Sequence, residues 1–381
     1  MSGLYNVRAC LPEKGIVRVD IEYENGVITR IGEAADKSVS SLADNAVVVP
    51  GFIDQHIHGL CGSEAMDASF ESLDTISREL AKEGTVAFLA TTLTQSPENI
   101  KAALTQTKNY VARGNFPGAE VIGVHLEGPF ISPKFVGAQN PEYVQKPEIS
   151  RFAEYQEAAG GLIRIVSMAP ETEGAGELIA YLLQNGVSAS AGHTAATYAD
   201  MKHAVEMGMK CVTHTYNAQS GVHHRDVGVA GSAMLFDELY TELICDTVHV
   251  SVPALKLMIK NKPADKVILI TDSIRPKGLP EGEYELGGLP IFLKGGEIRL
   301  VGGALAGSSL RANYAIRNLV EQVGVSFETA IGFATANPAR HLGVYDRMGS
   351  IEVGKDASFA VLDDTFEILQ TVIKGKTVYR A

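Results

Sequence analysis

The sequence has no cluster of basic residues, no long apolar run and few cysteines. Its 381 residues carry a formal net charge of −12, and nonspecific affinity for nucleic acid comes from clustered Lys and Arg, so a nucleic-acid partner is disfavoured. No run of about 18 apolar residues occurs, and no basic segment followed by an apolar one opens the chain. We therefore expect neither a membrane span nor a secretion signal. We expect a cytoplasmic location.

The four cysteines are far apart, and none forms a C-x-x-C pair: Cys10, Cys61, Cys211 and Cys245. In a cytosolic chain this spacing favours free thiols over disulfides. The sequence also lacks internal repeats and low-complexity segments. The chain exceeds the roughly 250–300 residues that one core supports, so we expect one large domain and a smaller one.

Apolar segments alternate with helical ones along most of the chain. Helices are expected between most of these segments, as at 73–83, 97–113 and 253–260, with Pro near the start or Gly past the end. Eight strand–helix units predict a (β/α)₈ TIM barrel, in which reactive residues collect at the C-terminal ends of the strands. The expected strands are 47–58, 85–91, 121–127, 162–168, 186–192, 210–215, 242–246 and 266–272.

Short strands with intervening turns occupy both ends of the chain. Residues 1–49 contain Asn25-Gly26, a strong hairpin signal. Beyond the eighth strand, 283–302 predicts a β-hairpin, 308–323 and 326–335 predict helices, and short strands then return. We predict a small β-domain from 1–49 plus 345–381, and a barrel from 50–344.

The segment 47–59 ends in His56-Ile57-His58. Side chains alternate along a strand, so this spacing places both imidazoles on one face and makes half of a metal site. Two hydrogen-bonded histidines at a strand end would explain the pair equally well.

Further ionisable residues stand at other expected strand ends. His125 and Glu127 end the third strand, His193 the fifth, His214 the sixth and Asp272 the eighth. A strand-end polar group bonded to a loop explains any one of them, but these ends converge in a barrel. Imidazole and carboxylate ligands suit Zn²⁺, although Fe, Mn and Co fit the same set. With Asp272 as general base, the pattern indicates metal-assisted hydrolysis.

Two later loops are candidates for substrate binding. After the sixth strand, His223, His224 and Arg225 form a polar cluster, and Arg offers a planar fork for phosphate or carboxylate; a solvated loop is the alternative. The glycine-rich segment 302–310 could present backbone N–H groups to a polar substrate, or simply form a tight turn.

Seven motifs spread over nearly the whole chain resemble one family. They are P-G-F-I-D-Q-H-I-H-G, H-L-E-G-P-F-I-S-P, S-A-G-H-T-A, T-H-T-Y-N-A, T-D-S-I-R-P-K-G-L-P-E-G, L-A-G-S-S-L and T-A-N-P-A-R. Together they resemble the N-acetylglucosamine-6-phosphate deacetylases of the amidohydrolase superfamily. The resemblance implies a barrel with a small β-sandwich from both termini, and hydrolysis of the substrate's acetamide to acetate and glucosamine 6-phosphate. It also implies a homodimer in which the neighbouring subunit helps to complete the phosphate site.

The resemblance also implies roles for individual residues. Glu127, His193 and His214 match the principal metal ligands, and His56 and His58 allow a second ion bridged by Glu127, so one or two divalent ions per chain are expected. Asp272 matches the catalytic acid and base, and His249 matches a residue that contacts the substrate and polarises its carbonyl. Sugar- or phosphate-contacting positions are Ala138, Gln139, Asn217, Ala218, Arg225, Leu305, Ala306 and Gly307.

One departure concerns phosphate selection. Gln139 stands where many relatives carry a His, and a neutral amide can donate a hydrogen bond but adds no positive charge. The strength of phosphate selection is therefore open.

Two other hydrolases on the same barrel are alternatives: a deacetylase of N-acetylgalactosamine 6-phosphate and a cyclic-amide hydrolase. A noncatalytic sugar-phosphate sensor would require broken ligands or a missing base, and both sets are intact.

Overall fold

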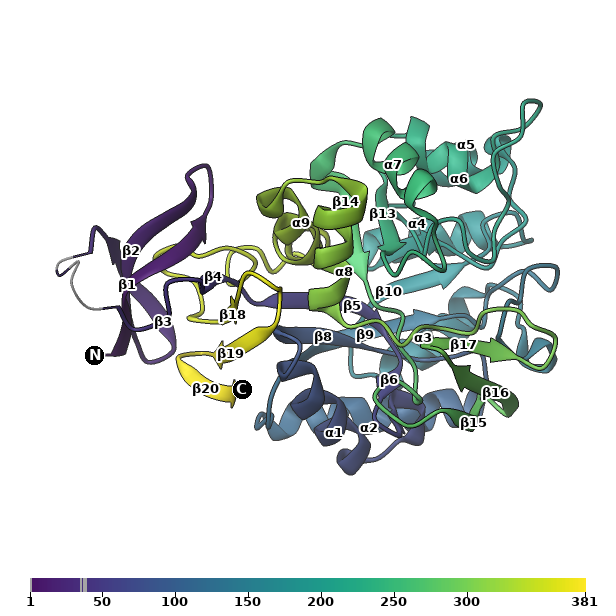
Figure 1. The fold of residues 1–381 in the computed structure, drawn as a ribbon. Coiled ribbons are helices and arrows are strands. Elements are labelled where there is room, and N and C mark those ends of the chain that lie inside the picture. The colour runs from purple at the N-terminus through teal and green to yellow at the C-terminus, as the bar shows by residue number, and fades with distance from the viewer. Residues whose placement is uncertain (1, 35, 37–39) are drawn as a thin grey trace.

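The structure is a computed structural model, which describes residues 2–34, 36 and 40–381. Eight parallel strands form the barrel, in the order β14-β13-β12-β11-β10-β9-β8-β5 (Figure 1). Hydrogen bonds from Asp272 N to His56 O (2.9 Å) and from His58 N to Ser273 O (3.0 Å) bring the end of the last strand to the first. The predicted barrel is confirmed, with strands β5 (Phe52–Ile57), β8 (Thr85–Thr91), β9 (Glu120–Glu127), β10 (Ile163–Met168), β11 (Ser188–Ala191), β12 (Cys211–Val212), β13 (Tyr240–Ile244) and β14 (Val267–Ile270).

Helices surround this barrel (Figure 1). The helix predicted at 97–113 is confirmed, because Ser96 accepts the Asn99 N–H at its start and Gly114, at φ 66°, ends it. The α-helices are α1 (Phe70–Ala81), α2 (Pro97–Arg113), α3 (Ile149–Ala158), α4 (Ala175–Gln184), α5 (Tyr198–Met207), α6 (Gly228–Leu235), α7 (Val252–Asn261), α8 (Ala312–Asn318), α9 (Phe327–Ala334) and α10 (Ala336–His341). Shorter helical turns are η1 (Ala65–Asp67), η2 (Pro141–Tyr143), η3 (Ala264–Lys266) and the π-turn η4 (Leu319–Val323). The helix expected at 308–323 therefore begins only at Ala312.

Both ends of the chain build one seven-stranded sheet beside the barrel, in the order β20-β19-β18-β4-β1-β2-β3 (Figure 1). The predicted hairpin is present, with Asn25 at φ 50° and Gly26 at φ 82° between β2 and β3. Val7, Val48 and Phe359 share one apolar core, so the expected small β-domain from both termini is confirmed, while its boundaries remain predictions. Its strands are β1 (Ser2–Leu11), β2 (Gly15–Glu24), β3 (Val27–Gly32), β4 (Val47–Pro50), β18 (Phe359–Leu362), β19 (Ile368–Ile373) and β20 (Lys376–Arg380).

The segment expected as one strand over 47–58 is divided between the two sheets. A Cβ on Gly51 would lie 2.2 Å from Val86 Cγ1, so only glycine allows this close approach. The Gly51 N–H bonds to Ser358 O in the small sheet, whereas the Phe52 N–H bonds to Gly84 O in the barrel, both at 3.0 Å. The chain thus crosses between sheets at Gly51.

A separate antiparallel sheet covers one side of the barrel mouth. Where one hairpin was expected, it has three strands, β15 (Gly282–Leu286), β16 (Leu289–Lys294) and β17 (Glu297–Leu300). Leu286 and Ile291 pack with Leu93 and Ile274 from the barrel loops. The short strands β6 (Gly59–Leu60) and β7 (Ser63–Glu64) pair after β5. Among the described residues, no helix has the length and apolarity needed to cross a membrane.

Candidate active site

A cavity of about 320 Å³ lies at the C-terminal ends of the barrel strands. It brings together residues that are far apart in the sequence, as the barrel prediction requires. Three apolar side chains that the sequence analysis did not single out, Leu93, Ile274 and Leu286, form part of its wall. The expected site residues that line it are His58, Glu127, Ala138, Gln139, His193, His214, Asn217, Ala218, His249, Asp272, Leu305 and Gly307.

Glu127 lies between two groups of histidines on the cavity floor. Its Oε1 is 3.2 Å from His193 Nε2 and 3.1 Å from His214 Nε2. The two histidine Nε2 atoms are themselves 3.1 Å apart. A tetrahedral ion bound at about 2.0–2.1 Å separates its ligand atoms by roughly 3.3–3.4 Å. The spacing of Glu127, His193 and His214 therefore fits a divalent ion.

A second group faces Glu127 from the other side. His56 Nε2 and His58 Nε2 are 3.4 and 3.2 Å from Asp272 Oδ1, and they are 3.4 and 3.3 Å from the two Glu127 oxygens. His56 is fully buried, and its Nε2 has no hydrogen-bond partner. Since a buried polar atom is costly without a partner, this nitrogen between two carboxylates also fits a cation. Glu127 is placed to bridge the two groups.

The charges of the floor follow from these contacts. Burial raises the pKa of Glu127 and Asp272, but His56 and the other neighbouring imidazoles outweigh burial and hold both pKa values below their usual range. Burial lowers the pKa of His58, but hydrogen bonds to Asp272 and Glu127 outweigh burial and raise this pKa to about 9. Both carboxylates are ionised at neutral pH and require positive charge nearby.

The backbone at three of these residues is strained. His193, His214 and Asp272 have φ values of 51°, 28° and 49°, in the left-handed region that costs a non-glycine residue about 1–3 kcal/mol. Surrounding hydrogen bonds maintain this conformation, for example from Asp272 N to His56 O. Such strain is concentrated at functional sites, and these three residues all line the cavity.

Two polar residues stand above the floor. His249 Nδ1 lies 2.6 Å from Asp246 Oδ2; burial lowers the pKa of His249, but this contact raises it above the ordinary value. Gln139 accepts the Thr94 N–H through Oε1 at 2.9 Å, which leaves its Nε2 3.2 Å from His193 Nε2. Gln139 thus presents its N–H donors to the metal-ligand groups.

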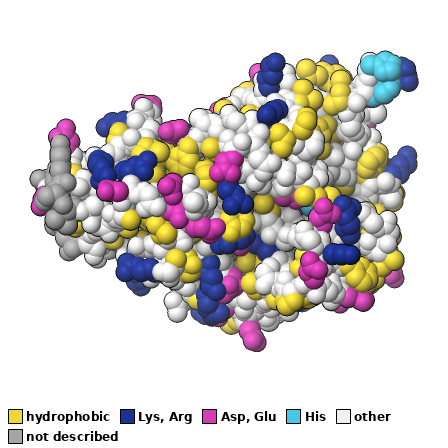
Figure 2. Space-filling model, in the orientation of Figure 1, with side chains coloured by type: hydrophobic (Ala, Val, Ile, Leu, Met, Phe, Trp, Pro, Cys, Tyr) yellow, Lys and Arg dark blue, Asp and Glu magenta, His cyan; other side chains and the backbone are white. Residues whose placement is uncertain are grey.

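Two expected substrate residues do not line the cavity. Ala306 is fully buried in the apolar cluster that also contains the wall residues Leu93, Ile274 and Leu286. Arg225 is exposed, with Nη1 2.7 Å from His224 Nε2. It lies on the loop between β12 and α6, which extends away from the barrel and carries His and basic side chains at its tip (Figures 1 and 2).

The sequence analysis did not identify Glu242, which contacts one of the metal-ligand candidates. It is fully buried in β13, and its Oε2 lies 3.1 Å from His56 Nδ1. The available signal was a charged residue at the start of the apolar segment predicted as the seventh strand, since buried charges are rare unless they are paired.

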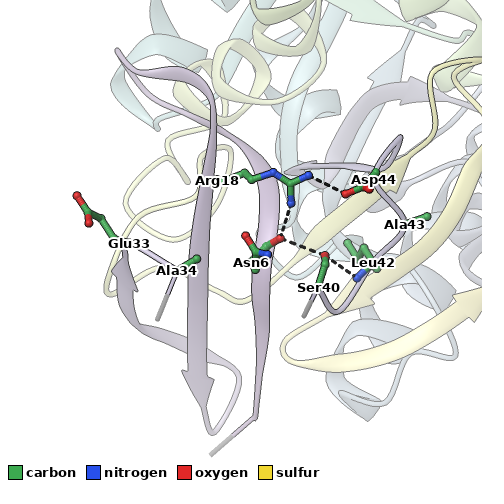
Figure 3. A pocket seen from close by; sticks show the side chains of 8 residues that line it. All are labelled: Asn6, Arg18, Glu33, Ala34, Ser40, Leu42, Ala43 and Asp44. Atoms are coloured by element: carbon green, nitrogen blue, oxygen red, sulfur yellow. Dashed lines mark hydrogen bonds and ion pairs between the residues drawn. The ribbon is translucent and has the colours of Figure 1, made fainter. Parts of the chain in front are cut away.

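A second hollow of about 680 Å³ lies on the small β-domain (Figure 3). Its Arg18 is already paired with Asp44 at 2.7 Å and with the Asn6 carbonyl at 3.0 Å. The described clusters with metal-ligand spacing all lie in the barrel, so the chemistry of the chain is concentrated there.

Comparisons with known proteins agree with this geometry. The amidohydrolase family pattern matches residues 47–378. An N-acetylglucosamine-6-phosphate deacetylase of Bacillus subtilis (strain 168) is 42% identical over 91% of this chain and 88% of its own length. An N-acetylgalactosamine-6-phosphate deacetylase of Escherichia coli O157:H7 is 36% identical over 99% of both chains. A solved mutant of the N-acetyl-D-glucosamine-6-phosphate deacetylase from Mycobacterium smegmatis, in complex with N-acetyl-D-glucosamine-6-phosphate, superposes with a TM-score of 0.92. That chain is 27% identical, and the match covers 99% of this chain and all of that one.

Proposed function

The chain belongs to the amidohydrolase family, and we propose that it hydrolyses the acetamide of N-acetyl-D-glucosamine 6-phosphate to acetate and D-glucosamine 6-phosphate. The observation that carries the proposal is the cavity floor, where Glu127, His193, His214 and Asp272 meet in one cavity with residues expected to contact the sugar. The relatives named above, matched over nearly the whole chain, are deacetylases of amino-sugar phosphates.

Glu127, His193 and His214 would hold one divalent ion, and His56, His58 and Asp272 would hold a second, with Glu127 close enough to contribute to both. Zinc suits this set best, and Fe, Mn and Co fit the same ligands. When bound, such an ion lowers the pKa of water from 15.7 to about 7 and polarises a carbonyl oxygen.

The remaining chemistry belongs to residues of the chain. Asp272, which is ionised, takes a proton from the attacking water while the water oxygen bonds to the acetamide carbon. His249, whose Nδ1 lies 2.6 Å from Asp246 Oδ2, donates an N–H to the carbonyl oxygen as negative charge develops there. Asp272 then returns the proton to the departing amine as the C–N bond breaks. The products are acetate and the free amino sugar.

The phosphate site is proposed to include the neighbouring subunit of a homodimer. Support comes from Arg225, which is exposed on the loop between β12 and α6 and does not line the cavity of its own chain. An arginine in this position could reach a second copy, where its fork suits a phosphate. We also propose a cytoplasmic location, with which the four free cysteines agree.

The E. coli relative makes N-acetylgalactosamine 6-phosphate the second candidate substrate. The test is acetate release from both phosphorylated sugars, from unphosphorylated N-acetylglucosamine and from a cyclic amide, with the enzyme fully loaded with metal. We expect the highest kcat/KM for N-acetylglucosamine 6-phosphate and a large drop without the phosphate. Ring opening of the cyclic amide, without acetate release from either sugar phosphate, would overturn the proposal.

A further inference from the structure

Glu242 lies beneath the cavity and takes no part in the proposed chemistry. It is fully buried in β13, and three N–H groups point at its carboxylate. Oε2 lies 3.1 Å from His56 Nδ1 and accepts the backbone N–H of His214 at 3.2 Å. Oε1 accepts the side-chain N–H of Gln55 at 2.6 Å. A buried carboxylate with three donors is well satisfied as an anion.

A chain of hydrogen bonds behind Glu242 determines the orientation of Gln55. His341 Nε2 lies 2.8 Å from Ser188 Oγ, and His341 Nδ1 lies 2.9 Å from Gln55 Oε1. Burial lowers the pKa of His341 to about 4, so its ring is neutral. Since the amide oxygen of Gln55 only accepts, His341 donates from Nδ1. The amide nitrogen of Gln55 must then face Glu242.

The same reasoning determines which nitrogen of His56 is available. A carboxylate only accepts hydrogen bonds, so His56 carries a hydrogen on Nδ1, toward Glu242. Nε2 is the nitrogen left for a ligand bond, and it has no hydrogen-bond partner among the described residues. It faces Glu127 Oε1 and Asp272 Oδ1, each at 3.4 Å.

The histidines of the other metal group, His193 and His214, have no carboxylate behind their rings in the part of the chain that the structure describes. His193 Nδ1 lies 3.0 Å from the carbonyl oxygen of Phe135, which is a neutral acceptor. His214 Nδ1 is without a hydrogen-bond partner among the described residues. Within the described chain, His56 therefore differs from both, because a buried carboxylate stands behind its ring.

We propose that Glu242 is a positioning residue for the second metal position, because it holds the hydrogen of His56 on Nδ1 and keeps Nε2 free as a stronger ligand. A carboxylate behind a ligating histidine orients the ring and raises its basicity, and losing it typically costs about 10- to 100-fold in metal affinity. The inference rests on the metal-binding part of the proposed function. It predicts that Glu242 governs the second ion and leaves the first nearly unaffected.

The experiment is calorimetric titration of the metal-free protein with Zn²⁺, for the wild type and Glu242→Gln. The amide has nearly the same shape but offers one oxygen to three donors. We expect two binding steps in the wild type, and in the variant one unchanged step and one weakened about 10- to 100-fold. Gln55→Leu is a second variant: Glu242 keeps its charge and loses one partner, so we expect a smaller weakening of the same step.

Glu83→Gln is the matched control. Glu83 is also buried, but it pairs with Lys277 at 2.7 Å and contacts none of the metal-ligand candidates. We expect a lower melting temperature with both binding steps intact, which separates loss of a buried charge from loss of the ligand support.

Three results would overturn the inference: a wild type that binds one ion only, a Glu242→Gln variant that binds both ions as tightly as the wild type, or equal weakening of both steps. Acetate release is measured separately on the same samples. A protein that binds two ions, loses the second in Glu242→Gln and hydrolyses none of the acetamido sugars would refute the proposed function and support this inference.

Discussion

Replacing Asp272 by Asn tests the proposed proton transfers directly. The two side chains have nearly the same shape, but the amide cannot take a proton from water. Positioned acid–base groups typically contribute about 10²–10⁴-fold to rate, which corresponds to about 2.7–5.4 kcal/mol of transition-state stabilisation. Since Asp272 is assigned both transfers, we expect kcat to fall by an amount near the upper end of that range.

The position of Asp272 predicts how metal binding and substrate binding respond. The group of Glu127, His193 and His214 does not include Asp272, so one ion per chain should remain. The second ion should bind more weakly, because Asp272 Oδ1 lies 3.2 Å from His58 Nε2 and an amide oxygen is a poorer ligand than a carboxylate. KM should change little, since Asp272 acts on the water and on the leaving amine.

The assay is acetate release between pH 5 and 9, with metal content measured on the same samples. Burial raises the pKa of Asp272 and the imidazoles lower it by more, so the wild-type base stays ionised throughout this range. The control is Asp74→Asn, which removes an α1 carboxylate that lies 2.5 Å from Arg113 and should leave turnover unchanged. If Asp272→Asn holds one ion and keeps more than about a tenth of wild-type kcat, the acid–base assignment is wrong.

Two further predictions concern the phosphate and the metal. Arg225→Ala should lower kcat/KM for the phosphorylated sugar by about 10- to 100-fold, as expected for loss of a charged hydrogen bond worth about 1.5–3 kcal/mol. It should leave the slow turnover of the unphosphorylated sugar unchanged; equal losses for both sugars would contradict a phosphate contact. Removing metal with a chelator should abolish acetate release and lower the melting temperature, because an ion that binds only the native state stabilises it. Added Zn²⁺ should restore both, and full activity in the chelated protein would refute metal dependence.

The barrel could be predicted because its signals are local and repeated. Pro97 at the first helical turn and Gly114 beyond the last one delimit α2 correctly, since each acts through its own backbone. Alternating strands and helices then determine the fold class, and the fold brings strand ends together. Glu127 and His214 could be placed in one cavity for that reason, although they are 87 residues apart.

Other features depend on contacts that no local pattern contains. The division of the predicted strand at Gly51 follows from the close approach of Val86 to the Gly51 backbone. The β-forming residues on both sides of Gly51 predict one uninterrupted strand instead. Arg225 could be recognised as an anion-binding candidate, but its distance from the cavity depends on how its loop projects. The role of Glu242 depends on His56, which lies 186 residues away. The sequence shows that Glu242 is a charged residue in an apolar strand, but it does not show that His56 is its partner.

The costs at the cavity floor favour the metal interpretation over a structural one. Burial of two ionised carboxylates, Glu127 and Asp272, is unfavourable unless positive charge is close. Left-handed backbone at His193, His214 and Asp272 adds strain of about 1–3 kcal/mol for each residue. A floor serving only stability would avoid both costs, because apolar residues of similar volume usually replace buried charges without loss. A cation in each of the two groups would offset the charge of both carboxylates, and the strained residues would hold their side chains in position to bind it, so stability and catalysis at this site should depend on the same ions.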